Sequence, residues 1–508
     1  MSFEPLTPTA FLVRAGAVFA DRVAVIDEDR RYTYAQFLDR ALRLAGALRG
    51  LAVEAGDRVA VLAPNTHVLL EAHYGVPFAG AVLVALNPRL TAGDLTGIVR
   101  HAGASVLVYD GDFDAVAREI GAANAGLRLV RADEYETLLQ GAQPYRSAVE
   151  DERALLAINY TSGTTGSPKG VMYHHRGAYL QALAMALHTK LDASSRFLWT
   201  LPMFHCNGWC FTWGVTAAGA THVCERKVEP ARVWRHLAES GITHFNAAPT
   251  VLVMLAWHES AQPLQGRVAV ATGGAPPTPA LLSRLASLGM DVTHLYGLTE
   301  TFGPAVICDW HPEWNAASAE EQARFKARQG VGNVIAQRIR VVDSAGADVA
   351  RDGTALGEIA LRGNNVMLGY YRDEEATRRA APDGWFRSGD LAVVHPDGYL
   401  EIRDRAKDII ISGGENIASI EVERVLVSHP AVMEAAVVAG PDPVWGEVPV
   451  AFVTLKSGVV VSEQHLIDHA RASLAHFKAP KRIVFGDLPK NATGKIQKFV
   501  LRDRAKGP

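Results

Sequence analysis

Tyr-Thr-Ser-Gly-Thr-Thr-Gly-Ser-Pro-Lys-Gly, residues 160–170, follows an apolar run at residues 154–158. A strand that ends in a loop of glycines and hydroxyl residues is typical of a phosphate-binding loop, because glycine has no β-carbon to keep the backbone away from an anion. The hydroxyl groups add hydrogen-bond donors, and Lys169 adds a positive charge. The residues expected to surround the phosphates are Thr161, Ser162, Gly163, Thr164, Thr165, Gly166 and Lys169.

The loop differs from a Walker A motif, in which the lysine is followed by serine or threonine. Lys169 instead lies between Pro168 and Gly170, which disfavours a nucleotide kinase or a motor protein. A flexible linker is the more common explanation for a stretch rich in Gly, Ser and Thr. Because a linker explains neither the order of these residues nor the strand before them, we interpret the stretch as a polyphosphate site.

The composition is that of a globular enzyme. The 508 residues suffice for about three domains or subdomains. Hydrophobic residues make up 48% of the chain and charged residues 21%, which excludes a disordered or fibrous protein. The net charge of −3 provides no overall field that would attract nucleic acid or an anionic membrane, so an anion site must be local.

The sequence predicts a cytoplasmic protein. Residues 1–10 lack the basic start and apolar run of a signal peptide, and no apolar segment approaches the length that spans a bilayer. Four cysteines are too few for a disulfide framework and show no paired C-x-x-C spacing, so a zinc site that uses His205 or His222 is disfavoured. We expect these cysteines to be reduced: Cys206, Cys210, Cys224 and Cys308.

Short strand-like runs alternate with amphipathic helices through the first part of the chain. Residues 23–26 and 31–33 predict a hairpin, and Thr33 with Gln36 predicts a capping box that opens a helix ending near Gly50. Such alternation predicts a layered α/β fold with largely parallel strands. Shorter strand-like runs after residue 330 predict a small β-barrel region that closes the large domain.

Two further stretches carry residues suited to a nucleotide. Residues 272–277 read Thr-Gly-Gly-Ala-Pro-Pro after an apolar strand, and the two glycines let a flat ligand lie against the backbone. Residues 294–300 read His-Leu-Tyr-Gly-Leu-Thr-Glu. Tyr296 can stack on a purine, Thr299 can donate to a phosphate oxygen, and Glu300 can bind Mg²⁺. Taken alone, an ordinary βα turn and a solvated glutamate are the simpler explanations.

Taken in order, these stretches resemble the motifs of the acyl-adenylate-forming superfamily, which includes acyl-CoA synthetases, luciferases and peptide-synthetase adenylation domains. The patterns Tyr-Thr-Ser-Gly-Thr-Thr-Gly-x-Pro-Lys-Gly and Tyr-Gly-x-Thr-Glu are matched throughout, and Ser-Gly-Asp at residues 388–390 and Gly-Lys at residues 494–495 follow. The resemblance implies a large N-terminal domain at residues 1–406. It also implies a small, mobile α+β domain at residues 407–508, which rotates about a hinge at Lys407.

The resemblance further implies roles for single residues. Lys495 is expected to contact the substrate carboxylate and the α-phosphate, Thr299 to contact the α-phosphate, and Glu300 to hold Mg²⁺. The other residues implied for ATP or AMP, besides the phosphate loop, are Gly274, Ala275, Pro276, Tyr296, Gly297, Asp390 (on the ribose) and Arg405. Those implied for the acyl pocket are His205, Trp209 and Gly273, and those for the CoA tunnel are Ser412, Gly413 and Gly414.

An aromatic cluster surrounds the predicted pocket residues, with His205, Trp209, Phe211 and Trp213 in close succession. Aromatic residues at strand spacing are commonly core, and a histidine beside them is commonly a satisfied core residue. The superfamily, however, places such an element at the border of the acyl pocket. We therefore assign His205 to the pocket wall and to the catalytic candidates, and leave Trp209 divided between wall and core.

Residues 478–508 carry nine Lys or Arg and two Asp, a local excess of 9 − 2 = +7. Nucleic acid is one partner that such a patch attracts, but aromatic residues do not interleave the charges as they do in many nucleic-acid sites. A substrate that carries phosphates explains the charge equally well. We therefore expect no nucleic-acid partner.

These observations predict an ATP-dependent carboxylic acid:CoA ligase, with an organic acid, ATP and CoA as substrates and Mg²⁺ as cofactor. Residues 205–213 and 295–302 contain no Arg or Lys, which disfavours a dicarboxylate and favours an apolar acid, either a short- or medium-chain fatty acid or an aryl acid. One alternative is an amide-forming ligase of the same fold, with His205 as the base that removes a proton from the amine. The other is a non-catalytic nucleotide-binding regulator, which the intact Lys495 and Glu300 disfavour. The sequence leaves open whether the protein forms a homodimer.

Overall fold

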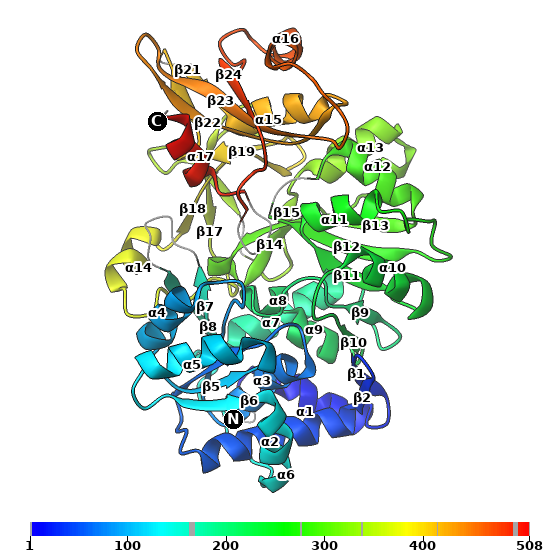
Figure 1. Ribbon diagram of the computed structural model, residues 1–508, viewed down its shortest axis with the longest axis vertical. Helices are drawn as coiled ribbons and strands as arrows, with labels where there is room; N and C mark the ends of the chain where they lie inside the picture. The colour runs from blue at the N-terminus through cyan, green and yellow to red at the C-terminus, as the bar shows by residue number, and fades with distance from the viewer. Residues whose placement is uncertain are drawn as a thin grey trace. The chain divides into compact units, whose positions relative to one another are not determined.

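The computed structural model describes residues 3–161, 168–274, 277–336, 339–413, 415–490 and 496–506 (Figure 1). The chain forms two compact units. Unit 1 comprises Met1–Ala327, Val331–Arg338 and Leu361–Phe386, and unit 2 comprises Arg328–Gly330, Ile339–Ala360 and Arg387–Pro508. The chain thus passes between the units several times before residue 407, and the predicted domain boundary at that residue stays a prediction.

The first sheet of unit 1 has six strands in the order β6-β5-β3-β4-β7-β8. All neighbouring strands pair in parallel except β7 and β8, which are antiparallel. The central strands carry almost uninterrupted apolar residues, as expected for parallel strands buried on both faces. The strands are Arg58–Leu62 (β3), Val82–Ala85 (β4), Ala104–Tyr109 (β5), Arg128–Arg131 (β6), Leu155–Thr161 (β7) and Lys169–His174 (β8).

The second sheet of unit 1 has nine strands in the order β15-β14-β13-β12-β11-β9-β10-β1-β2. Its centre, from β13 to β1, is parallel, and the edge strands β2, β14 and β15 are antiparallel to their neighbours. The strands are Val23–Asp27 (β1), Arg30–Thr33 (β2), Arg196–Leu198 (β9), Thr221–Cys224 (β10), His244–Ala247 (β11), Val268–Gly273 (β12), Met290–Leu298 (β13), Gly303–Ile307 (β14) and Val331–Gly332 (β15).

Helices cover both sheets of unit 1. Helices α4 and α5 pack on one face of the six-stranded sheet, and α10, α11 and α12 pack on one face of the nine-stranded sheet (Figure 1). A third apolar cluster includes buried residues of both sheets and of α1, α2, α3, α7 and α9. The helices are Thr9–Val18 (α1), Tyr34–Gly50 (α2), His67–Phe78 (α3), Ala92–Ala102 (α4), Asp114–Ala123 (α5), Ala132–Gly141 (α6), His175–His188 (α7), Cys206–Trp209 (α8), Phe211–Ala217 (α9), Pro230–Glu239 (α10), Pro249–Ala256 (α11), Pro279–Ser287 (α12), Ala319–Ala327 (α13) and Glu374–Ala380 (α14), with 3₁₀ turns at Gly111–Phe113 (η1), Thr299–Thr301 (η2) and Pro312–Ala316 (η3).

Unit 2 contains two sheets. One has the order β16-β17-β18-β19; the other has the order β21-β20-β23-β22, with β24 also paired to β23. The second sheet and its helices enclose their own apolar cluster, which supports the expectation that this part of the chain has an independent core. The elements are Arg340–Val342 (β16), Gly357–Leu361 (β17), Phe386–Val394 (β18), Leu400–Arg405 (β19), Ile410–Ser412 (β20), Glu415–Ile417 (β21), Ser419–Ser428 (α15), Val432–Asp442 (β22), Gly446–Leu455 (β23), Glu463–Ser473 (α16), Arg482–Phe485 (β24) and Lys498–Ala505 (α17).

Several expectations about the fold are confirmed, and two need correction. The first hairpin is β1–β2, and Thr33 and Gln36 form the predicted capping box at the start of α2. The small β region is an open four-stranded path over the described residues, and the expected barrel closure is not observed in them. Trp209 lies on α8, and Phe211 and Trp213 lie on α9, so these aromatic residues are not at strand spacing; β9 already ends at Leu198.

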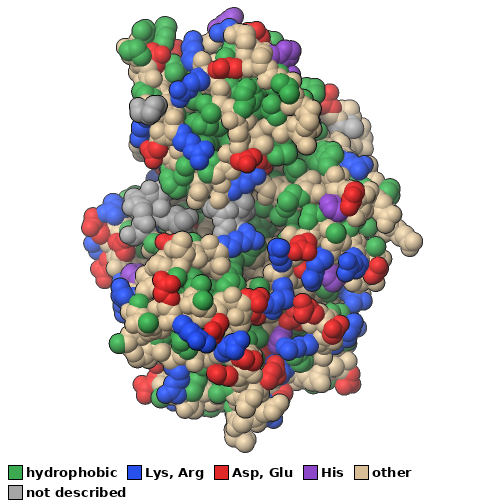
Figure 2. Space-filling view, viewed as in Figure 1, with side chains coloured by type: hydrophobic (Ala, Val, Ile, Leu, Met, Phe, Trp, Pro, Cys, Tyr) green, Lys and Arg blue, Asp and Glu red, His purple; other side chains and the backbone are tan. Residues whose placement is uncertain are grey.

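The described surface carries both signs of charge. On the face shown in Figure 2, Lys and Arg side chains are interspersed with Asp and Glu, consistent with the small net charge of the chain. Within the described residues, no helix combines the length and the apolar composition needed to cross a membrane.

Asp27, at the end of β1, and His67, at the start of α3, form a buried ion pair. Asp27 Oδ2 lies 2.5 Å from His67 Nδ1, and Glu136 Oε1 lies 3.5 Å from His67 Nε2. Burial disfavours the imidazolium, but hydrogen bonds to Asp27 and Glu136 outweigh burial and raise the pKa of His67 to about 9. Because the folded-state pKa exceeds the unfolded one, this stabilisation is complete below about pH 6.5 and is lost as the pH rises through about 9.

The melting temperature of the wild type should therefore fall as the pH rises from about 7 to about 10, and His67→Gln should flatten that fall. The variant should also melt lower than the wild type near pH 6, because it leaves the Asp27 carboxylate buried without its cation. Calorimetry across this pH range measures both effects. A pH slope that the substitution leaves unchanged would contradict the assignment.

Candidate active site

Thr161 and Lys169 flank the phosphate loop. Thr161 ends β7, Lys169 opens β8, and the two residues are cross-strand partners. The antiparallel pairing therefore brings both flanks of the loop to the same end of the sheet. Five residues of the loop that are predicted to contact phosphate lie outside the described residues: Ser162, Gly163, Thr164, Thr165 and Gly166.

Thr299 and Glu300 lie in η2, the turn between β13 and β14. The Tyr173 hydroxyl on β8 donates to the Thr299 carbonyl oxygen at 2.6 Å, and its ring stacks on Phe302 with 3.9 Å between the ring centroids. The Cys206 thiol lies 3.5 Å from Thr299 Oγ1. The turn that carries the two predicted catalytic residues is therefore held by the strand that begins with Lys169.

Tyr296 and Gly297 lie at the end of β13, opposite Val306 and Pro304 of β14. A β-carbon at Gly297 would collide with the Gly303 carbonyl oxygen, so the close approach of the two strands requires glycine at this position. Gly297 is therefore required for strand packing. Tyr296 remains the residue of the Tyr-Gly-x-Thr-Glu motif that is the candidate for stacking on a purine. The proposed adenine contacts Ala275 and Pro276 lie outside the described residues.

Lys169 and Glu300 converge on Tyr370. The Tyr370 hydroxyl donates to Glu300 Oε1 at 2.8 Å, and Lys169 Nζ lies 4.7 Å from the centroid of the Tyr370 ring. An ammonium over an aromatic face is a cation–π contact, and a hydroxyl bound to a carboxylate is a charge-assisted hydrogen bond. The predicted phosphate-binding lysine and the predicted metal-binding glutamate are thus brought to one side chain, although they are far apart in the sequence.

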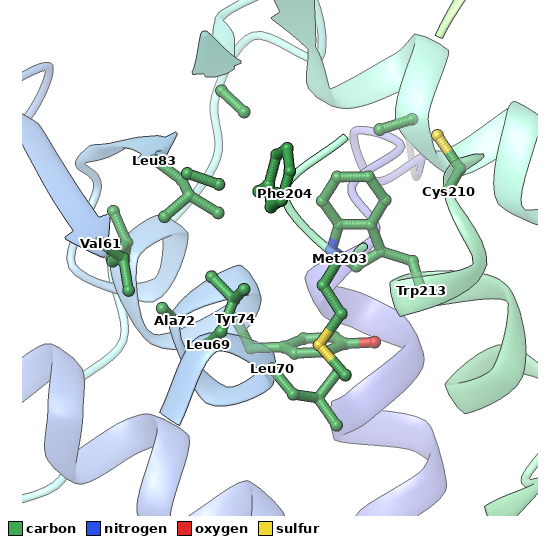
Figure 3. Close-up of a cluster of buried hydrophobic side chains, with 14 of the residues drawn as sticks. Val61, Leu69, Leu70, Ala72, Tyr74, Leu83, Met203, Phe204, Cys210 and Trp213 are labelled. Carbon is green, nitrogen blue, oxygen red and sulfur yellow. The ribbon is translucent and has the colours of Figure 1, made fainter. Parts of the chain in front are cut away.

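Residues 206–210 form a left-handed turn. Their φ angles are 49°, 44°, 60°, 55° and 62°, and only the residue in the middle is glycine. Left-handed backbone costs about 1–2 kcal/mol for each non-glycine residue, so surrounding contacts must hold the turn. The turn lies against a large apolar core, and Figure 3 shows Cys210 from the turn near Trp213.

Two asparagines connect this turn to the strand before the phosphate loop. Asn159 on β7 donates through Nδ2 to Asn207 Oδ1 at 2.6 Å, and the Asn207 backbone nitrogen donates to Asn159 Oδ1 at 3.2 Å. Thr212 Oγ1 donates to the Asn207 carbonyl oxygen at 3.0 Å. Because both asparagines are buried, these bonds do not compete with water, and they fix the turn relative to β7.

Trp209 and Gly273, both predicted for the acyl pocket, lie against each other. A β-carbon added at Gly273 would lie 3.3 Å from Trp209 Cη2 and 2.8 Å from the Leu295 carbonyl oxygen. One added at Gly303 would lie 3.1 Å from Trp209 Cα. The indole therefore packs on a surface that stays open only because both positions are glycine. This neighbourhood agrees with Trp209 as a wall residue, and its role in an acyl pocket stays a prediction.

His205 and Trp213 lie on either side of Trp209. His205 is partly buried and its Nε2 lies 3.7 Å from Cys206 Sγ, so it reaches Thr299 through that thiol. Trp213 is fully buried and donates through Nε1 to the His73 carbonyl oxygen at 3.2 Å. The aromatic cluster thus divides into core, to which Trp213 belongs, and residues close to η2.

Asp390 and Arg405, the predicted ribose anchor and nucleotide contact, pair with each other in unit 2. They are cross-strand partners on β18 and β19, and Arg405 Nε lies 2.9 Å from Asp390 Oδ1. The Asp390 carboxylate is only 6% exposed, so the guanidinium stabilises a largely buried charge. A nucleotide that uses Asp390 must share its carboxylate with Arg405.

Lys407 follows β19 and is held by α17. Arg502 of that helix donates to the Lys407 carbonyl oxygen at 3.4 Å and forms an ion pair with Asp408. Burial, followed by the charges of Arg405 and Arg502, lowers the pKa of Lys407. The hinge role of Lys407 stays a prediction.

Ser412, predicted for the CoA tunnel, ends β20 and pairs with Glu415 of β21, so the two strands form a hairpin. Gly413 has a φ of 59°, and a β-carbon there would lie 2.6 Å from Trp445 Cε3. Trp445 is 53% exposed, and its carbonyl oxygen accepts a hydrogen bond from the Gly413 backbone nitrogen at 2.9 Å. Gly414 lies outside the described residues.

The described residues fit Mg²⁺ better than a metal held by protein alone. Within them, no group of three or more His, Cys, Asp or Glu side chains is arranged to hold a metal ion. Mg²⁺ is commonly bound through one or two carboxylates together with substrate phosphates, so a single glutamate beside a phosphate loop suits it. Tyr370 binds Oε1 of Glu300, and Oε2 is the candidate ligand.

Four residues near the predicted site were not identified from the sequence: Tyr370, Asn159, Asn207 and Trp445. None belongs to a motif with a chemical signature. Tyr370 follows a glycine in a stretch that predicts only a turn, and a tyrosine hydroxyl gains its function from its partner. Only Trp445 has a signal in the sequence, as a large aromatic residue between Asp442 and Gly446, where a polar turn is typical.

Comparison with known proteins agrees with this geometry. Residues 12–371 match the family model described as AMP-binding enzyme, and residues 421–495 match the model described as AMP-binding enzyme C-terminal domain. The chain belongs to the AMP-binding enzyme family. The predicted relationship to adenylate-forming enzymes is therefore confirmed, and so is the predicted class of fold.

Relatives of this AMP-binding enzyme match it over nearly its whole length. An acetate–CoA ligase of Humulus lupulus is 44% identical, over 99% of this chain and 95% of the relative. A peroxisomal benzoate–CoA ligase of Arabidopsis thaliana is 43% identical, over 99% of this chain and 94% of the relative. A crystal structure of an anthranilate CoA ligase in complex with anthranoyl-AMP has a TM-score of 0.88 and 26% identity, over 99% of this chain and 98% of that one.

Proposed function

We propose that this chain is an ATP-dependent carboxylic acid:CoA ligase that forms an acyl-AMP intermediate and releases pyrophosphate. The observation that carries the proposal is the convergence of Lys169 and Glu300 on Tyr370, next to the η2 turn that holds Thr299. This arrangement offers a cation and a carboxylate for polyphosphate binding. The full-length similarity to CoA ligases supports CoA as the acceptor.

In the first half-reaction, a carboxylate oxygen attacks the α-phosphorus of ATP and the bond to the pyrophosphate oxygen breaks. Lys495 and Thr299 stabilise the negative charge that develops on the α-phosphate oxygens, and Lys495 also offsets the repulsion between the incoming carboxylate and the phosphate. Mg²⁺, when bound at Glu300, supplies charge compensation for the departing pyrophosphate. In the second half-reaction, the CoA sulfur attacks the acyl carbonyl carbon, the bond to AMP breaks, and the thiol proton is released.

We further propose that the small domain at residues 407–508 reorients between the half-reactions about Lys407, withdrawing Lys495 and presenting Gly413 to CoA. A lysine that follows a glycine can approach and leave a substrate, which suits a residue used in only one step. The hairpin at Gly413 and the half-exposed Trp445 beside it offer a surface for a pantetheine arm.

The substrate that we propose is an apolar acid, either a short- or medium-chain fatty acid or an aryl acid. Trp209 against the Gly273 backbone presents an apolar wall, and Arg and Lys are absent from residues 205–213 and 295–302. A second carboxylate in this position would therefore lack a cation partner.

We also propose a cytoplasmic location, supported by the four free cysteines. The benzoate–CoA ligase of Arabidopsis thaliana is named peroxisomal. Imaging of the tagged protein distinguishes the two locations.

The test combines the purified protein with Mg-ATP and a panel of acids that includes acetate, butyrate, hexanoate and benzoate, with malonate as the doubly charged control. Release of pyrophosphate and AMP, and an acyl-CoA detected by mass spectrometry, are the expected results. If an added primary amine yields an amide and CoA yields no thioester, the acyl acceptor is an amine and not CoA. If the protein binds ATP but forms AMP with none of the acids, the ligase is refuted and the remaining alternative is a non-catalytic nucleotide-binding regulator.

Asp390→Ala should weaken ATP binding by about 2–4 kcal/mol, because the ribose would lose a charge-assisted partner for its hydroxyl groups. Asp397→Ala is the matched control, since Asp397 is also an ion-paired aspartate of unit 2 but binds Arg328. Calorimetric titration with ATP measures both variants. Equal affinities of the Asp390 variant and the wild type would exclude Asp390 as the ribose anchor.

A further inference from the structure

Backbone hydrogen bonds on both sides of residues 367–371 fix the position of Tyr370, independently of its side-chain contacts. Residues 368–371 run antiparallel to β8: the Leu368 nitrogen donates to the Met172 carbonyl oxygen at 3.0 Å, and the Tyr371 nitrogen donates to the Gly170 carbonyl oxygen at 2.7 Å. On the other side, the Met367 nitrogen donates to the Glu300 carbonyl oxygen at 2.9 Å. This short segment therefore lies between the strand that begins with Lys169 and the turn that carries Glu300.

The side chain of Tyr370 uses both of its chemical faces. Its hydroxyl donates to Glu300 Oε1 at 2.8 Å, and its ring lies under Lys169 Nζ at 4.7 Å. The residue is 9% exposed. A carboxylate oxygen can only accept a hydrogen bond, so the Tyr370 hydroxyl is the donor, and burial shields this bond from water.

Lys169 and Glu300 carry opposite charges, and both are needed for the ligand. A direct ion pair between them would satisfy each charge with the other, and phosphate or a cation would then have to break that pair before binding. Within the described residues, the contacts of Tyr370 stand in place of a direct Lys169–Glu300 pair. A neutral aromatic spacer keeps the Lys169 ammonium and the second carboxylate oxygen of Glu300 out of a direct pair with each other.

We propose that Tyr370 is a positioning residue that separates Lys169 from Glu300, so that the lysine is available to the phosphates and the glutamate to the cation that accompanies them. The inference rests on the proposed function, because it assigns Tyr370 to the binding of the same Mg-ATP. Two effects are separable: the hydroxyl orients Glu300, and the ring keeps Lys169 away from it.

Three variants separate these effects. Tyr370→Phe keeps the ring and removes the hydroxyl, so the Mg²⁺ concentration for half-maximal ATP binding should rise about tenfold, as expected for the loss of one hydrogen bond to a charged group. Tyr370→Leu removes the ring as well and should weaken ATP binding even without Mg²⁺, because Lys169 and Glu300 can then pair directly. Tyr371→Phe is the matched control, since that hydroxyl lies 3.5 Å from the Ala102 carbonyl oxygen and contacts neither charge.

The primary measurement is equilibrium binding of ATP, by calorimetric titration, in Mg²⁺ and in excess EDTA. The wild type and Tyr371→Phe should gain the same factor in affinity from Mg²⁺, and Tyr370→Phe should gain less. An equal gain in Tyr370→Phe would overturn the inference. Failure of the wild type to form AMP with any acid would refute the ligase, whereas these binding measurements would still decide the role of Tyr370.

A double-mutant cycle distinguishes positioning from general stability. On a Glu300→Gln background, Tyr370→Phe should cause no further loss of Mg²⁺-dependent binding, because its hydroxyl acts through Glu300. An additive loss would show that the hydroxyl serves the fold instead, and would overturn the inference. The comparison holds even if Tyr370→Phe lowers the melting temperature, because the effect of this substitution is measured separately on the wild-type and the Glu300→Gln backgrounds.

Discussion

Replacing Lys495 by alanine is expected to slow acyl-AMP formation by about 10²–10³-fold, the effect typical of removing one donor that stabilises charge in a transition state. Thioester formation from supplied acyl-AMP should be nearly unaffected, because the proposed reorientation withdraws Lys495 before that step. Pyrophosphate exchange measures the first half-reaction, and acyl-CoA production from synthetic acyl-AMP measures the second.

Lys490→Ala is the control for Lys495. It lies in the same basic segment, but its Nζ is 2.6 Å from Glu434 Oε2, so its charge is used within the fold. Its loss should leave both half-reactions close to those of the wild type. Equal losses in both half-reactions for Lys495→Ala would refute the assignment of this lysine to adenylation.

Trp209→Ala should change which acids are used, in favour of larger ones. The indole fills the space against the Gly273 and Gly303 backbones, so its removal leaves a cavity that a bulky aryl acid can occupy. A change of pocket size typically alters the ratio of kcat/KM between two acids by about 10–200-fold. Rates with hexanoate, benzoate and a naphthoate, compared within each variant, measure that ratio.

Removal of a buried tryptophan also costs about 3–5 kcal/mol of stability, which alone would lower every rate. Trp213→Ala controls for this cost, because Trp213 is buried in the core on α9 and donates to the His73 carbonyl oxygen. It should destabilise the protein without changing the order of preferred acids. The same change of preference in both variants would exclude Trp209 as a specific wall of the pocket.

Much of the fold is predictable because local patterns and tertiary contacts agree. The capping box of Thr33 and Gln36 and the hairpin before it depend only on neighbours in sequence, and both are confirmed. The enzyme class is also confirmed by the comparisons, since the motifs that carry it are contiguous. The roles of Lys495, Thr299 and Asp390 stay predictions, because they depend on bound substrates.

The sequence does not predict contacts that depend on distant partners. Nothing near Tyr370 indicates that Lys169 and Glu300 flank it, because the three residues meet only after β8, the η2 turn and residues 367–371 have come together. The strand spacing expected for Trp209, Phe211 and Trp213 is wrong, because hydrophobic periodicity gives no sign of the left-handed turn at residues 206–210. Side-chain partners of Asn207 decide that conformation, and they come from β7.

The left-handed turn at residues 206–210 limits how this enzyme can be redesigned. Randomised libraries aimed at new acids should vary Trp209 through residues without a branched β-carbon, since valine, isoleucine and threonine tolerate positive φ poorly. Asn207 should be left untouched, because its amide ties the turn to β7. Selection for altered specificity will therefore find more folded clones by changing one indole position than by exchanging the whole segment.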